Sequence, residues 1–447
     1  MAEKDKNASG GIFGNGKMHP KLEKLMATTQ TRLQLKDVFV TPSFRHDCIN
    51  SGSTVINLLI GGSRLPDGSF VCPGYPKGGI VEIFGKESSG KTTLALTAVG
   101  QALAANGGTG TGLYVDLEYA VKDAYAMKLG VDFRPPNLGG HGRVLRSTPH
   151  SFEEAELIVN TAAMGGVDII VVDSVAALVS KREFDRDPTN EKEKSGLAEI
   201  PRLMSRWIPK LQAFIARSKT SVIFINQTRD KIGAMGYTEE QLKSTTGGNA
   251  LKFFASARMM LSPRQMSKAK RFNPLTKEQE DVPIATDIIV KMIKNKIDAR
   301  QGHAGLITIR YGVGIDELRT TLNIAEAYGI IKKSKNAKKQ DIYSFRSPKN
   351  GETLEEIGVE KFRYVLSSPK NSAMYEEVSE LCTSRILEGF KAIDDAELAQ
   401  LAEDAVVKIM SSEEDEDDYD QTETKVSEAE PGVDYNDLTM DLEDKAN

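Results

Sequence analysis

The sequence has 447 residues, of which 40% are hydrophobic and 27% charged, so it can form a main globular domain with smaller flanking pieces. It has no run of about eighteen or more apolar residues, and the segment MAEKDKNASGG lacks the apolar core of a secretion signal. We therefore expect a soluble, cytoplasmic protein with no membrane partner. The three cysteines, Cys48, Cys72 and Cys382, are far apart in the sequence without metal-ligand spacing, which predicts ordinary reduced thiols.

The net charge of −5 is unevenly distributed along the chain. Residues 411–447 contain 15 acidic residues and 2 lysines, a net of −13, which leaves a net of +8 on the remainder. Because this segment can bury little apolar surface, we predict a disordered acidic tail over 411–447. Two interpretations stay open: the tail only solubilises the protein, or it competes with an external polyanion for the basic body.

The first 78 residues contain an amphipathic helical stretch near KLEKLMATTQTRL and a Gly/Pro-rich segment from Gly61 to Gly79, which indicate an adaptor followed by a linker. From residue 80 to about 318, short apolar strands alternate with helical patterns. IVEIF precedes a helix from Lys91 to Ala105, then GLYVDLE follows, and a capping box of Ser151 and Glu154 opens the helix before VDIIVVDS. A further helix from about Leu197 to Arg217 precedes SVIFINQ.

Near-continuous apolar strands separated by helices predict an α/β fold with a mainly parallel central sheet covered on both faces. Three more apolar runs, FFASARMML, TDIIVKMIK and GLITIRYG, are expected to extend that sheet. Residues 319–410 mix helical patterns with the Lys-rich interruption KKSKNAKKQ, which predicts a small separate C-terminal α/β domain. The predicted units are thus 1–78, 79–318, 319–410 and 411–447.

The segment GKESSGKTT at residues 85–93 matches the pattern G-x-x-x-x-G-K-[ST]. In this pattern the glycines let backbone N–H groups approach phosphates, the lysine reaches the β- and γ-phosphates, and the hydroxyl holds Mg²⁺. The apolar strand before it and the helix after it are the context that the motif requires. The sequence therefore predicts a site for a nucleoside triphosphate and Mg²⁺, formed by Gly85, Glu87, Ser88, Ser89, Gly90, Lys91, Thr92 and Thr93.

Three polar residues end apolar strands, and in open α/β sheets such strand ends lie at the ligand-binding edge. Asp173, after DIIVV, is expected to support Mg²⁺, although an aspartate there can also simply cap a turn or a helix. Glu118, after LYVDL, is either the general base that polarises the attacking water or an exposed strand-end carboxylate. Gln227, after VIFIN, can hydrogen-bond a γ-phosphate and lose that bond after hydrolysis, which would make it a nucleotide sensor.

Six segments carry a resemblance to a known family: EIFGKESSGKTT, DLEYAVKDAYAMKLGVD, DIIVVDSVAAL, FINQTRDKIG, TTGGNALKFFASARM and IKNKI. They occur in the order and approximate spacing of bacterial RecA, the ATP-dependent DNA strand-exchange recombinases. The chain resembles this family strongly over about residues 79–320, faintly over 321–400 and loosely before residue 79. TTGGNALKF is not expected in replicative helicases or in archaeal and eukaryotic recombinases.

The resemblance implies a RecA-type P-loop NTPase core with small N- and C-terminal domains, the first 78 residues serving oligomerisation. It implies an ATP-dependent recombinase that forms a helical filament on single-stranded DNA and exchanges strands with homologous duplex DNA in recombination and repair, with DNA-stimulated ATP hydrolysis. Single-strand-binding and loader proteins are the further partners that it suggests. Two other interpretations remain: a hexameric DNA-translocating ATPase or helicase, and a regulatory filament protein that binds DNA without exchanging strands.

The resemblance also assigns residue roles. Lys91 and Thr92 would bind phosphate and Mg²⁺ with support from Asp173, while Glu118 would activate water and Gln227 would sense the γ-phosphate. Tyr125 would stack on adenine, and Lys294 and Lys296 would reach ATP on the neighbouring subunit, although without the family they are simply one solvated face. The implied DNA-facing loops span about residues 183–196 and 228–248. The implied DNA contacts are Arg202, Arg229, Lys231, Thr245, Thr246, Gly247, Gly248, Asn249 and Lys291.

Some residues depart from the family pattern or fit an ordinary surface equally well. Lys268, Lys270, Arg271 and Lys291 form either a second, weaker site for duplex DNA or plain solvated surface. Lys122 stands where the family usually has an aspartate near the base. The insertion SRLPDGSFVCPGYP and the extra residues around YTEEQLK are also unusual. These departures, with the acidic tail, indicate a divergent member, such as one encoded by a phage.

Overall fold

The computed structural model describes residues 20–33, 45–65, 67–186, 199–230, 243–298 and 300–389. The helices in these residues are α1 (Pro20–Leu33), α2 (Thr54–Gly61), α3 (Lys91–Gly108), α4 (Asp123–Lys128), α5 (Phe152–Met164), α6 (Lys181–Phe184), α7 (Glu199–Ser218), α9 (Asn249–Phe254), α10 (Glu317–Ala327), α11 (Val359–Leu366) and a last helix over residues 372–389. The strands are β1 (Cys48–Ile49), β2 (Tyr75–Pro76), β3 (Ile80–Gly85), β4 (Gly112–Asp116), β5 (Val144–Ser147), β6 (Ile169–Asp173), β7 (Ser221–Asp230), β8 (Lys243–Thr245), β9 (Ala257–Asn273), β10 (Glu278–Asn295), β11 (Ala304–Arg310), β12 (Gly314–Ile315), β13 (Lys332–Lys335), β14 (Asp341–Arg346) and β15 (Thr353–Ile357).

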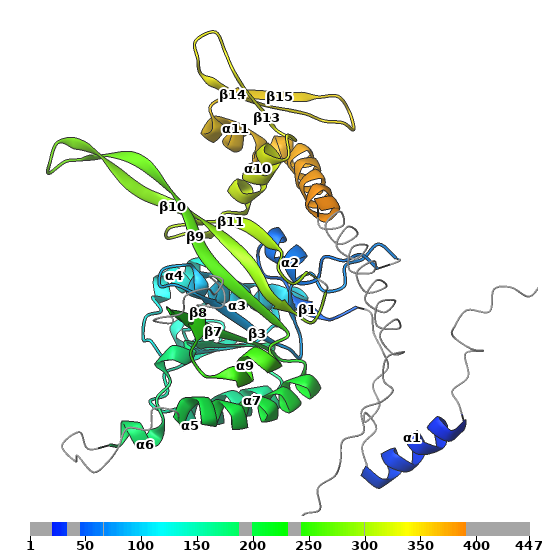
Figure 1. Ribbon diagram of the computed structural model, residues 1–447. Coiled ribbons are helices and arrows are strands. Elements are labelled where there is room, and N and C mark those ends of the chain that lie inside the picture. Colours follow the sequence, from blue (N-terminus) through cyan, green and yellow to red (C-terminus); the bar gives the residue numbers. More distant parts are fainter. Residues whose placement is uncertain are drawn as a thin grey trace, which may run out of the picture. The chain divides into compact units, whose positions relative to one another are not determined.

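A large central sheet organises the fold, with strand order β12-β11-β10-β9-β3-β7-β6-β4-β5 and β8 paired to β7 (Figure 1). The strands from β9 through β3, β7, β6 and β4 to β5 run parallel to their neighbours, whereas β9 to β12 pair antiparallel. The predicted α/β fold with a mainly parallel sheet is therefore confirmed. The three late apolar runs do extend the sheet, on its antiparallel side.

Both faces of this sheet are buried, which explains why its strands read as continuous apolar runs. Ile169 and Val171 of β6 belong to the core cluster that includes α2 and α3. Ile170 and Val172, which point to the opposite face, belong to the cluster that includes α5 and α7. Figure 1 shows these helix pairs on the two sides of the sheet. The result is a three-layer core whose parallel strands end at one common edge.

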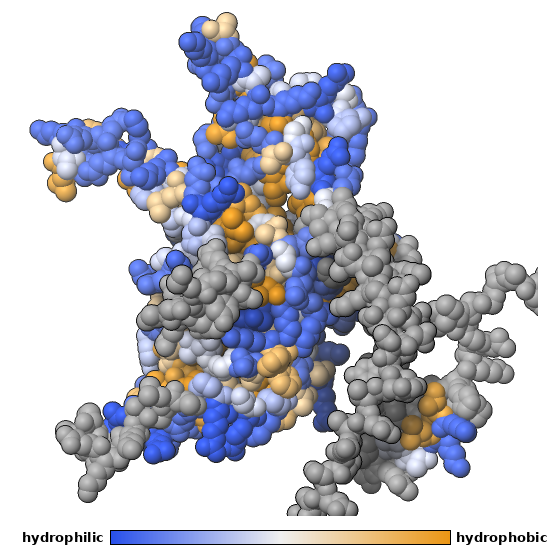
Figure 2. Space-filling view, viewed as in Figure 1, coloured by the Kyte–Doolittle hydropathy of each residue, from blue (hydrophilic) through white to orange (hydrophobic). Residues whose placement is uncertain are grey.

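The hairpin of β9 and β10 is longer than the sequence predicts. Its antiparallel register runs from Ala257 opposite Asn295 to Asn273 opposite Glu278, well past the apolar segments. Figure 1 shows a two-stranded ribbon that projects from the sheet, and Figure 2 shows that mainly hydrophilic residues cover it, with a hydrophobic patch at the tip. Phe272 and Leu275, 63% and 92% exposed, lie in this tip region. Because the projecting arms are polar, no apolar periodicity reveals them.

The C-terminal part of the described chain has its own small core. The three-stranded sheet β13-β14-β15 packs with α10, α11 and the last helix around Leu322, Phe345 and Phe362. The helix α10 also connects to the central sheet, since the Arg319 guanidinium donates to Ser267 Oγ of β9 at 2.7 Å. The predicted domain boundaries stay predictions, and the predicted acidic tail lies outside the described residues. Across the ranges given above, no helix has the length and apolarity required to cross a bilayer.

Cys48 and Cys72 meet in the fold, although the sequence separates them. The Cys48 segment runs beside the Cys72 segment, with the His46 N–H donating to the Val71 carbonyl at 2.8 Å. A hydrogen bond from the Cys72 thiol lowers the pKa of Cys48, and the same contact together with burial raises the pKa of Cys72. Both are free thiols, as predicted, but their proximity is a property of the tertiary structure.

Candidate functional site

The segment 85–93 forms a tight loop between β3 and α3. Gly90, directly before α3, has a φ of 88°, and a Cβ there would lie 2.4 Å from Ile309 Cδ1. A Cβ on Gly85 would lie 2.5 Å from the Leu261 carbonyl oxygen. Gly85 therefore requires glycine because a side chain would meet the backbone, and Gly90 favours glycine because of its left-handed φ. The loop leads directly into the N-terminus of α3, where backbone N–H groups and the helix dipole favour anions.

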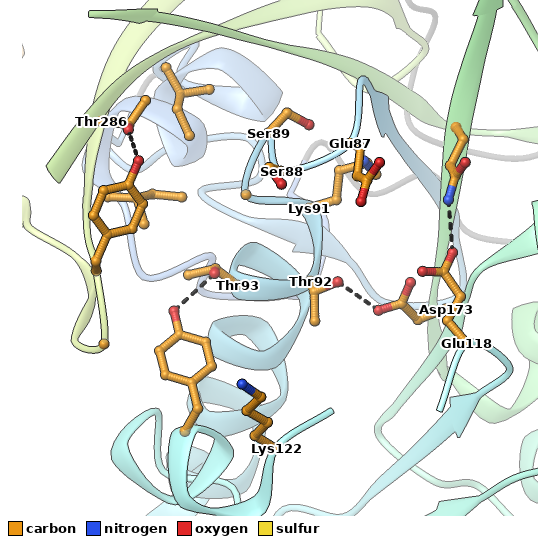
Figure 3. Close-up of a pocket in the computed structure, with 17 residues that line it drawn as sticks. Glu87, Ser88, Ser89, Lys91, Thr92, Thr93, Glu118, Lys122, Asp173 and Thr286 are labelled. Atoms are coloured by element: carbon orange, nitrogen blue, oxygen red, sulfur yellow. Dashed lines mark hydrogen bonds between the residues drawn. The ribbon is translucent and has the colours of Figure 1, made fainter. Parts of the chain in front are cut away.

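A cavity of about 690 Å³ opens over this loop (Figure 3). It is large enough for a nucleotide-sized ligand. Its lining residues are Glu87, Ser88, Ser89, Gly90, Lys91, Thr92, Thr93, Glu118, Lys122, Tyr125, Asp173, Gln227, Thr286, Ile288, Ile309, Tyr311 and Gly312. The structure thus brings every predicted nucleotide-site residue of this chain into one cavity except Gly85, which ends β3, and Lys294 and Lys296.

Lys91 is 8% exposed, and its ammonium donates to two loop carbonyls, Gly85 O at 3.2 Å and Lys86 O at 2.7 Å. Burial lowers its pKa, an effect that the nearby carboxylates of Asp173 and Glu118 oppose. Among the residues that the structure describes, the lysine therefore has no direct ion pair, and neutral carbonyls hold it against the loop. Such a group can exchange these carbonyls for phosphate oxygens at little geometric cost.

Asp173 and Thr92 form the second part of the cavity. The Thr92 hydroxyl donates to Asp173 Oδ2 at 2.8 Å, and the Tyr114 hydroxyl donates to the same oxygen at 2.6 Å. Burial raises the pKa of Asp173 although both hydrogen bonds favour its ionised form. Within the described ranges, no group of three or more His, Cys, Asp or Glu side chains forms a metal cage. One carboxylate and one hydroxyl fit Mg²⁺, because this ion is usually held by one or two protein oxygens together with substrate phosphates.

Glu118, which follows β4, and Gln227 of β7 are in direct contact. Gln227 Nε2 donates to Glu118 Oε1 at 3.0 Å, and the Ser174 hydroxyl donates to the same oxygen. The predicted strand ends differ slightly here: β4 ends at Asp116, so Glu118 lies in the following turn, and β7 continues beyond Gln227 to Asp230. The extension arises because β8 pairs with the end of β7. Glu118 and Gln227 nevertheless lie together at one edge of the sheet, where Ser174, for which the sequence contains no motif, joins them.

Two tyrosines from distant segments enclose the other end of the cavity. Tyr125 of α4 shares a hydrogen bond of 2.9 Å with the Thr93 hydroxyl, and burial raises its pKa. Tyr311, after β11, is hydrogen-bonded to the Thr286 hydroxyl of β10. Lys122 lies beside them, and Figure 3 shows its ammonium directed towards the pocket. Sequence reasoning missed Tyr311 and Thr286, for which no local motif exists.

Lys294 and Lys296 lie away from this cavity. Lys294 Nζ donates to the carbonyls of Lys252 at 2.6 Å and Phe253 at 2.8 Å, and Lys296 Nζ donates to Phe253 O at 2.7 Å. Both cations thus sit at the C-terminal end of α9, where helix carbonyls attract positive charge. Burial and the neighbouring Lys296 lower the pKa of Lys294 to about 8.

The TTGG segment, residues 245–248, connects β8 to α9. Thr245 lies opposite Thr228 of β7, and Gly247 and Gly248 have φ values of 91° and 76°. Asn249 begins α9 with an exposed side chain, and Arg202 is exposed on α7. Residues 187–198 and 231–242, which include Lys231 and most of both predicted DNA-facing loops, lie outside the described residues, as does the side chain of Arg229.

The four residues of the proposed second DNA site do not gather in one place. Lys268, Lys270 and Arg271 lie on the projecting hairpin, where Lys270 faces Asp281 and Arg271 faces Glu280. Lys291 lies in the body of the sheet, opposite Met260 and Ala304. Since a strand advances about 3.3 Å per residue, Lys291 is roughly 25 Å along the ribbon from the position opposite Lys268.

The phosphate loop between a buried strand and a helix, with a hydroxyl and a carboxylate at the adjoining strand end, defines a P-loop ATPase of the α/β class. Residues 43–316 match the RecA N-terminal domain family. Curated relatives include Protein RecA of Mesoplasma florum, 38% identical over 65% of this chain and 75% of that protein, and Protein RecA of Thermus aquaticus, 38% identical over 66% and 75%. Protein RecA of Streptococcus pneumoniae is 34% identical over 79% of this chain and 78% of its own length.

The chain belongs to the RecA family. It is accordingly an ATP-dependent recombinase of DNA recombination and repair and a DNA-dependent ATPase, as the resemblance in the sequence predicts.

Proposed function

We propose that ATP orders copies of this chain into a helical filament on single-stranded DNA, and that the filament exchanges strands with a homologous duplex. The observation that carries this proposal is the course of β7. At Gln227 this strand contacts Glu118 in the cavity at 3.0 Å, and at Thr228 it pairs with Thr245 of the TTGG segment. One strand therefore joins the nucleotide cavity to the proposed DNA-contacting residues, so nucleotide state can change DNA affinity.

Lys91, Thr92 and Asp173 are proposed to hold the triphosphate and Mg²⁺. Bound Mg²⁺ would neutralise charge on the β- and γ-phosphates. Thr92 would turn its hydroxyl from Asp173, now 2.8 Å away, towards the ion, and the carboxylate would stay in place through the hydrogen bond from Tyr114. Lys91 would move its ammonium from the loop carbonyls to phosphate oxygens. Glu118 would accept a proton from the attacking water, and Gln227 would exchange its contact with Glu118 for the γ-phosphate.

Lys294 and Lys296 are proposed to complete the site of a neighbouring protomer. They lie outside their own chain's cavity, and the carbonyls at the end of α9 hold both ammonium groups together. Two adjacent cations would stabilise charge in phosphoryl transfer, as an arginine finger does. Hydrolysis would then depend on filament assembly. The exposed Arg202 and the TTGG segment are proposed to contact DNA phosphates, which carry no sequence information. We expect this activity in the cytoplasm.

Lys122→Asp is expected to raise the preference for ATP over GTP by about tenfold, because a carboxylate accepts from the amino group of adenine, whereas an ammonium pairs with the 6-oxo group and N7 of guanine. The measurement is kcat/KM for DNA-stimulated hydrolysis of each nucleotide. Lys122→Met, which removes the charge but keeps a long side chain, is the control. Its ratio of kcat/KM for ATP to that for GTP should lie between the ratios of the unmodified protein and of Lys122→Asp. An unchanged ratio in Lys122→Asp would mean that the base does not contact this residue.

The test of the proposed function is joint-molecule formation between a single strand and homologous supercoiled duplex DNA, with ATP, with ADP, and with a heterologous duplex. Products are expected only with both ATP and homology. Unwinding of a forked duplex in place of homologous pairing would indicate a translocase. Normal filaments without joint molecules would indicate a regulatory filament protein.

A further inference from the structure

A buried polar network lies on the opposite face of β7 from the nucleotide cavity. Successive strand residues point to opposite faces, so Asn226 points away from the face of Gln227. Asn226 and Glu82 are each 0% exposed, on the face of the sheet covered by α7. The network consists of Asn226 from β7, Glu82 from β3, Arg258 from β9 and the backbone of Thr246.

Glu82 is the fixed centre of this network. Its Oε2 accepts from Arg258 Nε, and the Arg258 guanidinium lies 4.8 Å from the ring centroid of Phe84. Its Oε1 accepts from Asn226 Nδ2 at 3.0 Å. A buried carboxylate is tolerated only when its oxygens are satisfied, and here each oxygen has a partner. Because the pair joins two neighbouring strands, β3 and β9, it has little freedom to move.

Asn226 also forms hydrogen bonds to Thr246 of the TTGG segment and to the backbone of Gln227. Its Nδ2 also donates to the Thr246 carbonyl of the TTGG segment at 2.9 Å, and its Oδ1 accepts from the Gln227 backbone N–H at 3.0 Å. The hydroxyls of Thr245 and Thr246 are buried and have no hydrogen-bond partner among the described residues. Among the described residues, the TTGG turn is therefore held through its own backbone, and the hydrogen bond from the Asn226 side chain links that backbone to the protein interior.

We propose that Asn226 is a positioning residue that fixes the TTGG turn relative to Gln227, with the Glu82–Arg258 pair as its anchor. When Gln227 changes its position at the cavity, its backbone N–H moves. Asn226, which is bonded to that N–H and to the Thr246 carbonyl, then moves the TTGG turn with it. This inference rests on the proposed roles of Gln227 and of the TTGG segment. It adds a residue that touches neither nucleotide nor DNA.

The test is the ratio of dissociation constants for fluorescein-labelled oligothymidylate with ADP and with the slowly hydrolysed analogue ATPγS. The variants are Asn226→Ala and Asn226→Asp, and binding of a fluorescent ATP analogue and the melting temperature are measured in parallel. We expect both variants to bind the ATP analogue with an affinity within about threefold of that of the unmodified protein, while the ratio falls about tenfold or more.

Asn160→Ala is the matched control. The Asn160 amide oxygen accepts the Trp207 indole N–H, 2.9 Å away between α5 and α7, so this variant should lower the melting temperature and leave the ratio unchanged.

A double variant separates coupling from folding. In Glu82→Gln combined with Asn226→Asp, the amide and carboxylate exchange places, so the contact between the two side chains and a partner for Arg258 are restored. The Thr246 carbonyl still lacks its donor, so the melting temperature should recover whereas the ratio should stay low. A stable double variant with the ratio of the unmodified protein would overturn the proposal, as would unchanged ratios in both single variants. A ratio near one in the unmodified protein would overturn the proposed function as well.

Discussion

Lys91→Ala is expected to lower kcat/KM for ATP hydrolysis by about 10³-fold, equivalent to about 4 kcal/mol, and to abolish ATP-dependent strand exchange. Lys91 is a buried cation at the phosphate loop, and its ammonium would leave two neutral carbonyls, those of Gly85 and Lys86, when phosphate enters. The variant therefore loses the charge that would stabilise the β- and γ-phosphates. The measurement is steady-state hydrolysis with single-stranded DNA, together with joint-molecule formation.

Lys210→Ala is the control for this variant, because Lys210 is a 63% exposed lysine on α7, away from the cavity. It should keep activity within about twofold. Strand exchange at the normal rate in Lys91→Ala would remove the phosphate-loop assignment.

Glu118→Gln is expected to lower the rate of hydrolysis by about 10²- to 10⁴-fold while ATP binding persists, because the amide cannot accept the proton of the attacking water. The hydrogen bonds from Ser174 and Gln227 orient the carboxylate without replacing its basicity. If ATP stays bound, the filament should persist on DNA, so slow dissociation from an oligonucleotide should accompany slow hydrolysis. Single-turnover hydrolysis and filament lifetime measure these two effects.

Glu153→Gln is the control for Glu118→Gln, since Glu153 is an exposed glutamate that accepts the Lys181 N–H outside the cavity. Rapid hydrolysis by Glu118→Gln would show that a different group activates water. Slow hydrolysis with a short filament lifetime would show that ATP hydrolysis does not control release from DNA.

The phosphate loop can be predicted from a short stretch of sequence because its chemistry is local. Gly90 and Lys91 act within a few residues of one another, so a pattern of nine residues contains both the geometry and the charge. Asp173 and Gln227 were found less directly: continuous apolar runs predict parallel strands, and parallel strands that end together bring their last residues to one edge. The register confirms this reasoning, since Asp173 lies opposite Asp116 and Gln227 opposite Gly85.

Other parts of the site depend on strand order, which no single segment specifies. Tyr311 and Thr286 enter the cavity because β10 and β11 extend the sheet beyond β9. In the sequence, Asn226 is an ordinary polar residue near the end of a predicted strand, and Glu82 is an isolated acidic residue in an apolar segment. Only the adjacency of β9, β3 and β7 makes them a network with Arg258.

The sequence by itself determined the α/β class, the phosphate loop, the polar residues at the strand ends and the family, because each depends on short-range periodicity or on motifs with fixed spacing. The tertiary structure alone decided the projecting hairpin, the contact of Cys48 with Cys72, the tyrosine from β11 and the attachment of the TTGG turn to Asn226. The tyrosine in question is Tyr311, which follows β11, and these features depend on which segments become neighbours in the folded chain. The apolar pattern of a single strand is compatible with several neighbouring strands. Packing of the whole core therefore decides which strands pair.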